Sequence, residues 1–357
     1  MEKNIDFIGK GKSQGDMAAY MSNGRLDTGE LRPFIGNDGR AYITVFSGGD
    51  AKNPKNYKTM PINTNASLRR DEWKQLDEAV LKISETRLGG VQDLVDKGLV
   101  YGLGNGMGTT ILESHDISDA MEADLTMDGV TRSKGDRPSY GTNYLPIPII
   151  HVDYEINSRA LSASRKMGNP LDTTSAERAA RKVNEKLETM MFTATSYAFG
   201  GGTIYSYLNH PDRNTVSLST DWDGSPKTAA DIIEDVLSMK QASINAKHYG
   251  PWMIYIPTAY ETVLDEDYDT TKSNTIRERI LKIGGIQGIK VIDTLTANNI
   301  VMAQMTSDVV RLVRGMGIQN VEWQSEGKFI TNYKVMTIQV PQIRSDQDGN
   351  SGIIHMS

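Results

Sequence analysis

Cysteine is absent from this chain of 357 residues, which excludes disulfide bonds and metal sites built on thiolates. No run of about 18 apolar residues occurs, so we predict that no helix spans a membrane. The first residues, MEKNIDFIGKGKSQGD, lack the apolar stretch of a secretory signal. Together these absences are typical of a protein that is made in the cytoplasm.

Basic charge is also scarce. The chain has 39 Lys and Arg against 45 Asp and Glu, a net charge of −6. Because proteins that grip nucleic acid through its phosphates are usually basic, we expect at most weak direct contact with DNA. The hydrophobic fraction of 38% suffices for a core, and the length suits one elongated, multi-lobed subunit or two to three compact units.

Residues 1–66 have the composition of an arm, with one ordered element in the stretch LRPFIGNDGRAYITVF. Leu31–Ile35 and Arg40–Phe46 are predicted to form a β-hairpin around a Gly-Asn-Asp-Gly turn. A lone hairpin is marginally stable in water, so we expect it to rest on another surface, such as a neighbouring subunit. The expected contact residues of this arm hairpin are Phe34, Asn37, Asp38 and Tyr42.

The segment 67–104 is predicted to begin with an amphipathic helix, capped by Ser67 and ended by the Gly89-Gly90 pair. Its apolar residues recur at helical spacing and define one face, made of Trp73, Leu76, Val80 and Ile83.

Residues 105–143 form a long, polar excursion with too few apolar residues for a core of their own. Asp128-Gly129 is a two-residue hairpin signal in its middle. A polar excursion of this length is stable only when it docks, so we expect it to lie on a partner. The predicted interface residues of this extended loop are Met127, Asp128, Gly129, Arg132, Lys134, Asp136 and Arg137.

The segment 144–199 joins a strand to one long helix. Ile150, Val152, Tyr154 and Ile156 alternate with polar residues, the period of a strand with one buried face. The helix is predicted to start at Thr174, with Glu177 completing a capping box, and to run for roughly 25 residues or about 37 Å to a glycine triplet at 200–202. Its apolar stripe consists of Ala176, Ala180, Val183, Leu187, Met190 and Ala194, with Val183, Leu187 and Met190 as its core.

Residues 200–320 alternate helical and strand patterns and are predicted to form a mixed α/β lobe. Residues 321–343 contain a long strand suited to pair with the strand near 150, and the tail 344–357 is expected to be thin and polar. An acidic run in the lobe contains Asp265, Asp267 and Asp269. It lacks the glycine and the final glutamate of a calcium loop, because Thr270 and Ile276 stand there, so we interpret it as a solvated loop.

No catalytic, cofactor-binding or metal-binding constellation emerges from the sequence. The glycines at 102, 104, 106 and 108 do not match a dinucleotide fingerprint, since Met107 stands where its third glycine belongs. We interpret this run as a flexible hinge. His151 and Asp153 share the polar face of a strand, which favours a surface or interface pair over a catalytic one. We therefore expect no enzyme; a soluble nucleotide-using enzyme stays open only through the glycine run.

Several strings carry a resemblance to a known family. They are LRRDEWKQLDEAV with TRLGG, LPIPIIHVDYEINSRAL, LDTTSAERAARKVNEKLETMMF, TAADIIEDVLSMKQASI, YGPWMIYIPTAYETVL and ILKIGGIQGIKVIDTL. In their order they resemble the coat fold shared by tailed-phage major capsid proteins and encapsulins, over residues 67–343. The resemblance implies an α+β fold with an N-terminal arm, an extended loop, a peripheral lobe with a long spine helix, and an axial lobe.

In that family the extended loop lies over the adjacent subunit and the axial loops face the five-fold and six-fold axes. The resemblance thus implies a major capsid protein that assembles into pentamers and hexamers of an icosahedral shell around double-stranded DNA. Expected partners are copies of the chain, a portal, a separate scaffolding protein and, optionally, a decoration protein. The protein would be found in the virion capsid, after assembly in the host cytoplasm.

The alternative within this family is an encapsulin-type compartment that holds a cargo enzyme. Encapsulins begin near the first helix, whereas residues 1–66 precede it here, and this difference favours the viral reading. We also expect no N-terminal maturation cleavage, and no covalent cross-link through Lys134, because the family rarely uses one.

Overall fold

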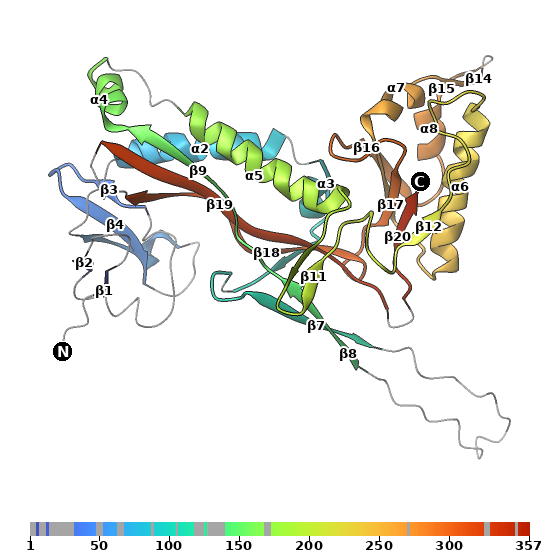
Figure 1. Cartoon of the computed structure of the whole chain (residues 1–357), viewed down its shortest axis with the longest axis horizontal. Helices are drawn as coiled ribbons and strands as arrows, with labels where there is room; N and C mark the ends of the chain where they lie inside the picture. The colour runs from blue at the N-terminus through green and yellow to red at the C-terminus, as the bar shows by residue number, and fades with distance from the viewer. Residues whose placement is uncertain are drawn as a thin grey trace.

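The computed structural model describes residues 5–6, 12–13, 32–47, 53–62, 68–86, 89–104, 106–117, 125, 127, 140–167, 173–269, 272–324, 329–346 and 349–357. Figure 1 shows an elongated subunit with two lobes. The peripheral lobe contains the helices α2 and α5 over a long sheet, and the axial lobe contains α6 and a second sheet. A hairpin of β7 and β8 projects from the body beneath them.

The peripheral sheet has the strand order β6-β18-β19-β9. Its strands are β6 (Val100–Gly102), β18 (Val310–Gln324), β19 (Ile330–Ile343) and β9 (Ile150–Asn157). The burial of β9 alternates along its length, as its sequence predicts. β19 pairs with β9 in antiparallel register, with Thr337 opposite Ile150, which confirms that the late strand returns to the strand near residue 150.

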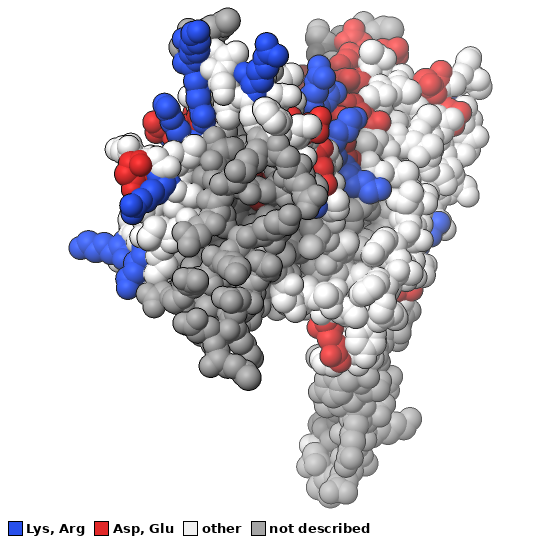
Figure 2. Space-filling view, turned by 60° about the vertical axis from the view of Figure 1, so that its left-hand side comes forward, with Lys and Arg blue, Asp and Glu red and all other residues white. Residues whose placement is uncertain are grey.

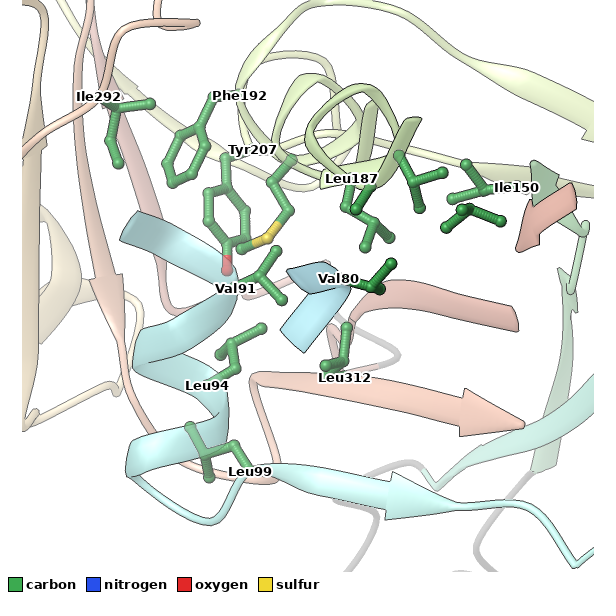
Figure 3. Close-up of a cluster of buried hydrophobic side chains, with 14 of the residues drawn as sticks. Val80, Val91, Leu94, Leu99, Ile150, Leu187, Phe192, Tyr207, Ile292 and Leu312 are labelled. Atoms are coloured by element: carbon green, nitrogen blue, oxygen red, sulfur yellow. The ribbon is translucent and has the colours of Figure 1, made fainter. Parts of the chain in front are cut away.

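Four helices belong to this lobe: α2 (Arg70–Thr86), α3 (Gly89–Asp96), α4 (Ser158–Met167) and α5 (Thr174–Phe192). Figure 3 shows side chains from α2, α3, α5 and β18 pointing into one cluster. The labelled members include Val80, Val91, Leu94, Leu187, Phe192 and Leu312. Burial of such side chains stabilises the fold by about 1.5–3 kcal/mol each.

The spine helix α5 begins at Thr174, as predicted, but its capping interaction and its end differ from the prediction. It has 19 residues, not roughly 25, because Thr193 turns to an extended conformation well before the glycine triplet. Its N-cap is Thr173, whose side chain does not cap a backbone N–H; its hydroxyl donates instead to the Glu177 carboxylate at 2.8 Å. Val183 and Leu187 are buried, as expected, whereas Met190 is half-buried. Ala194 lies beyond the helix and is exposed.

The Gly89-Gly90 pair also acts differently from the prediction. The first helix ends at Thr86, and Gly89 begins a second helix, α3. A Cβ on Gly90 would lie only 2.3 Å from the ring of Phe192, so glycine here permits close packing of α3 on α5.

The axial sheet has the order β12-β20-β17-β13-β16. Its strands are β12 (Asn214–Val216), β20 (Ile353–Met356), β17 (Ile300–Gln304), β13 (Trp252–Ile256) and β16 (Ile286–Val291). The helix α6 (Ala229–Asn245) starts with a complete capping box between Thr228 and Asp231. The short helices α7 (Glu261–Leu264) and α8 (Ile276–Leu281) pack nearby.

The predicted thin tail is wrong. All four residues of β20 are buried, and the strand lies between β12 and β17 inside the axial sheet. A fully buried strand has no alternation of apolar and polar residues. The apolar run here is short and follows the polar residues 344–352, so the sequence pattern did not indicate a strand. The axial lobe also ends earlier than residue 320, because β18 from Val310 onward pairs in the peripheral sheet.

The arm forms a three-stranded sheet of β3 (Phe34–Ile35), β4 (Ala41–Phe46) and β5 (Tyr57–Pro61). This confirms the hairpin and adds a strand that the sequence did not predict. Elsewhere β10 (Tyr197–Phe199) pairs with β11 (Gly202–Ile204), and β14 (Asp267–Asp269) pairs with β15 (Lys272–Thr275). Among the described helices, none has the length and apolar character needed to cross a membrane.

Candidate assembly surfaces

The extended loop leaves the body on two long paired strands, β7 (Ile111–Ile117) and β8 (Tyr140–Pro146). They pair antiparallel from Ile111 opposite Pro146 to Ile117 opposite Tyr140. Leu145 and Ile147 anchor the root in a buried cluster with residues of β18 and β19. The root is therefore a rigid continuation of the peripheral lobe.

Farther out on the loop, Leu125 is 101% exposed and Met127 is 105% exposed. Within the described part of the chain both apolar side chains are fully exposed, so a partner could reach them. Of the predicted loop residues, Met127 is thus in a position to make an interface. Asp128, Gly129, Arg132, Lys134, Asp136 and Arg137 lie outside the described residues.

The arm rests on α2 of its own chain, which supplies the surface that the hairpin was expected to need. Arg32 binds both oxygens of Asp77 on α2 at 2.6 Å and lies 4.7 Å from the ring centre of Trp73. The indole of Trp73 donates to the carbonyl of Pro33 at 3.0 Å. Phe34 packs against the peripheral core.

The turn of the arm hairpin faces solvent. Tyr42 donates to the Asp38 carboxylate at 2.7 Å, and this hydrogen bond lowers the pKa of Asp38. Asn37 is exposed beside it. Asn37, Asp38 and Tyr42 stay predicted interface residues, now on a sheet that the chain itself holds in place.

The junction of the two lobes contains buried polar groups that the sequence did not single out. Asp93 of α3 is buried and forms an ion pair with Lys290 of β16. It also accepts a hydrogen bond from the Tyr255 hydroxyl of β13 at 3.1 Å. Glu188 of α5 accepts from the backbone N–H of Gly90 at 3.2 Å, and burial, the largest cause, raises the pKa of Glu188.

The contacts of Asp93 fix the axial lobe on the peripheral lobe through charge as well as packing. Gly90 and Glu188 stand 98 positions apart in the sequence, and Asp93 and Lys290 stand farther apart still. The only local signal was an acidic residue on the apolar side of each helix.

A contact with an arginine holds one end of the acidic run of the axial lobe. Asp265 accepts from Arg277 Nε at 2.9 Å, and the side chains of Asp265 and Asp267 are exposed. Asp269 pairs through its backbone with Lys272. Within the part of the chain that the structure describes, no three His, Cys, Asp or Glu side chains gather as metal ligands.

The structure also describes the His151–Asp153 pair and most of the glycine run. His151 lies 3.4 Å from Asp153 on the exposed face of β9, and Lys334 approaches the same carboxylate at 3.5 Å. In the glycine run, a Cβ on Gly106 would lie 2.3 Å from the carbonyl oxygen of Gly315. Backbone packing against β18 thus explains Gly106, whereas a Cβ on Gly102 or Gly104 would meet nothing within 4 Å.

Charge is unevenly spread over the surface. Figure 2 shows charged side chains gathered on the upper part of the face in view, while the coloured atoms nearest the root of the projecting hairpin are acidic. On α5 the exposed side chains include Arg178, Arg181, Lys182 and Lys186, with Glu185 bound to two of them.

Comparison with known proteins shows which family this chain belongs to. The model of a family described as "Family of unknown function (DUF6260)" matches residues 63–356. The chain belongs to this family. The DUF6260 chain is 24% identical over 233 residues to the diheme-cytochrome-encapsulin shell fusion protein of Kuenenia stuttgartiensis. That match covers 65% of this chain and 59% of the relative, so the chain spans less than two thirds of the relative's length.

Solved structures show the same fold. A virus-like particle protein from Pyrococcus furiosus matches with a TM-score of 0.59 and 18% identity, over 80% of the DUF6260 chain and 99% of the other. The capsid of Myoviridae phage XM1 matches with a TM-score of 0.57 and 8% identity, over 76% and 92%. The capsid of a native GTA particle matches with a TM-score of 0.52 and 12% identity, over 75% and 90%.

The DUF6260 chain therefore has the α+β fold of tailed-phage capsids and encapsulin-like shells. The resemblance found in the sequence is confirmed, and the fold is one that forms capsid shells.

Proposed function

We propose that this chain is the major capsid subunit of a tailed phage, and that it assembles into pentamers and hexamers of an icosahedral shell around double-stranded DNA. The observation that carries the proposal is the projecting hairpin β7–β8, rooted in the peripheral core and bearing fully exposed Leu125 and Met127. A shell fold with such a hairpin suits repeated contacts between identical subunits, which close only under point-group symmetry.

The roles of the parts follow from this proposal. The extended loop lies on an adjacent subunit, the axial loop with Asp265, Asp267 and Asp269 lies near a symmetry axis, and the chain acts as a structural protein without enzymatic activity. Many modest contacts per subunit add up through multivalency. The net charge of −6 suits a shell that encloses DNA without binding it tightly. A portal and a separate scaffolding protein complete the assembly.

Electron microscopy of the purified protein, with and without scaffold, tests the proposal. We expect closed particles of uniform diameter whose contents absorb as nucleic acid when they are purified from a producing host. A chain that stays monomeric under every condition, with scaffold included, would refute the proposal.

The second candidate is an encapsulin-type compartment around a cargo protein. It is supported by the match to an encapsulin shell fusion protein. Mass spectrometry of purified particles separates the two candidates, because a stoichiometric protein cargo without DNA would favour the compartment.

A further inference from the structure

The spine helix α5 presents a basic face to its surroundings. Its exposed residues are all polar and none of them is acidic; they are Thr174, Ser175, Arg178, Arg181, Lys182 and Lys186. Because one helical turn takes 3.6 residues, the four cations lie on one side of the helix, opposite the buried Val183 and Leu187. The peripheral core therefore holds one side of α5 and leaves the cations on the other.

Only part of this positive charge is balanced within the chain. The half-buried Glu185 binds both Arg181, at 2.9 Å, and Lys182, at 2.7 Å. Among the described residues, neither Arg178 nor Lys186 forms an ion pair. One carboxylate thus serves four cations, and the face keeps an excess of positive charge.

The other long helices of the chain do not share this excess. Along the whole of α6 the exposed residues include no Lys or Arg, but they do include Glu234 and the apolar Leu237. The described side chains of α2 mix the two signs, as in the ion pair of Lys74 with Glu78. A solvated helix face usually carries both signs. The basic face of α5 is therefore a local feature of a chain whose net charge is −6.

The spacing of these cations suits a phosphate backbone. Arg178 and Lys186 stand eight positions apart, so the face covers about 12 Å of the helix axis. Over that length one strand of B-DNA presents about three to four phosphates, at about 3.4 Å each. A protein partner would be expected to cover apolar side chains at the centre of the contact, and none is exposed on α5.

We infer that the exposed face of α5 contacts the phosphates of double-stranded DNA through Arg178, Arg181, Lys182 and Lys186. The inference rests on the proposed function and names the surface at which the shell touches its contents. Figure 1 shows α5 on the opposite side of the peripheral sheet from the hairpin β7–β8, so the hairpin and the helix can face different partners. Each subunit makes few phosphate contacts, so the binding is weak for one chain and adds up over many copies.

The salt dependence of DNA binding by the unassembled subunit tests this contact. Fluorescence anisotropy of a short labelled duplex gives the association constant at several low salt concentrations. Its logarithm falls with the logarithm of the salt concentration, with a slope of about −0.9 for each neutralised phosphate, so three to four contacts predict a slope of about −2.7 to −3.6. Arg178→Gln with Lys186→Gln should weaken the binding and make the slope shallower by about 1.8.

The matched control is Lys58→Gln with Lys282→Gln, which changes one exposed lysine of the arm sheet and one of the axial lobe. Both double variants lose the same charge, so the general repulsion between the chain and DNA is equal in the two, and the control should keep nearly the wild-type slope. Arg178→Lys should also bind as the wild type does, because a phosphate contact of this kind needs only the positive charge. Circular dichroism checks that each chain is folded.

Four results would overturn the inference: no DNA binding by the wild-type chain at the lowest salt, wild-type binding after the α5 substitutions, an equal loss in the control, or binding of poly-glutamate as tight as that of DNA. The last result would assign the face to an acidic polypeptide. These measurements do not require a shell. A failure to form particles therefore bears on the proposed function, whereas an absent difference between the two double variants bears on the face of α5.

Discussion

Gly90 on α3 and the ring of Phe192 on α5 share one small volume at the lobe junction, so replacing Gly90 by alanine tests the packing there. The new Cβ would lie 2.3 Å from Cε2 and 2.6 Å from Cζ of Phe192. Apolar carbons in contact lie about 3.5–4.0 Å apart, so one partner must move by more than about 1 Å. The ring is held by Tyr207 and Tyr255, with centroids 5.4 and 4.9 Å away. We expect Gly90→Ala to lower the free energy of unfolding by about 1–3 kcal/mol.

The same substitution should behave differently when the ring is gone. Phe192→Leu removes the ring edge and should by itself cost about 1–3 kcal/mol, between a small truncation and a full Phe→Ala change. In that background the Cβ that Gly90→Ala adds has room, and alanine in place of glycine favours a helix by up to about 1 kcal/mol. Gly90→Ala should then be neutral or stabilising, which gives a coupling free energy of at least about 1 kcal/mol.

Urea unfolding measures these values, followed by circular dichroism and fluorescence at protein concentrations below those at which light scattering detects assembly. Gly102→Ala is the control, because a Cβ there meets no atom within 4 Å, and it should change stability by no more than about 0.5 kcal/mol. If the effects of Gly90→Ala and Phe192→Leu are additive within about 0.5 kcal/mol, the two sites do not share the space and the reasoning is refuted.

Three further predictions concern the extended loop and the core. Deletion of residues 120–140 should leave the subunit folded by circular dichroism but abolish assembly in light scattering; an unfolded monomer would mean that the loop belongs to a core. Val183→Asp places a charge at a fully buried position of the spine helix and should lower the urea midpoint sharply. At the extreme no soluble folded protein is obtained, and wild-type stability would contradict the prediction. Burial raises the pKa of Glu188, so the folded state holds this proton more tightly than the unfolded state does. The free energy of unfolding therefore falls as pH rises from the ordinary carboxyl range through the folded pKa. Glu188→Gln should flatten this fall in urea titrations at several pH values, and an unchanged slope would contradict the prediction.

Local signals sufficed for much of the fold. The alternation along Ile150–Asn157 and the helical stripe with Val183 and Leu187 each depend on neighbours within a few positions. Such short-range patterns reflect the geometry of a strand or a helix directly. For the same reason the order of elements was enough to find the capsid fold.

The errors arose where distant residues decide the conformation. Gly90 lies in the first turn of α3, where the ring of Phe192 leaves no room for a Cβ, and β20 is a buried strand because β12 and β17 flank it. The arm lies on α2 because Arg32 binds Asp77. These residues stand 45 positions apart, so no local pattern predicts their contact.

The sequence by itself determined the absence of thiols, the negative net charge, the order of helices and strands, and the charge difference between the two halves of the extended loop. Only the tertiary structure decided which apolar side chains stay exposed and how the lobes are joined through Asp93 and Lys290. The physical reason is that periodicity fixes the buried face of an element, whereas contacts between faces depend on how the whole chain packs.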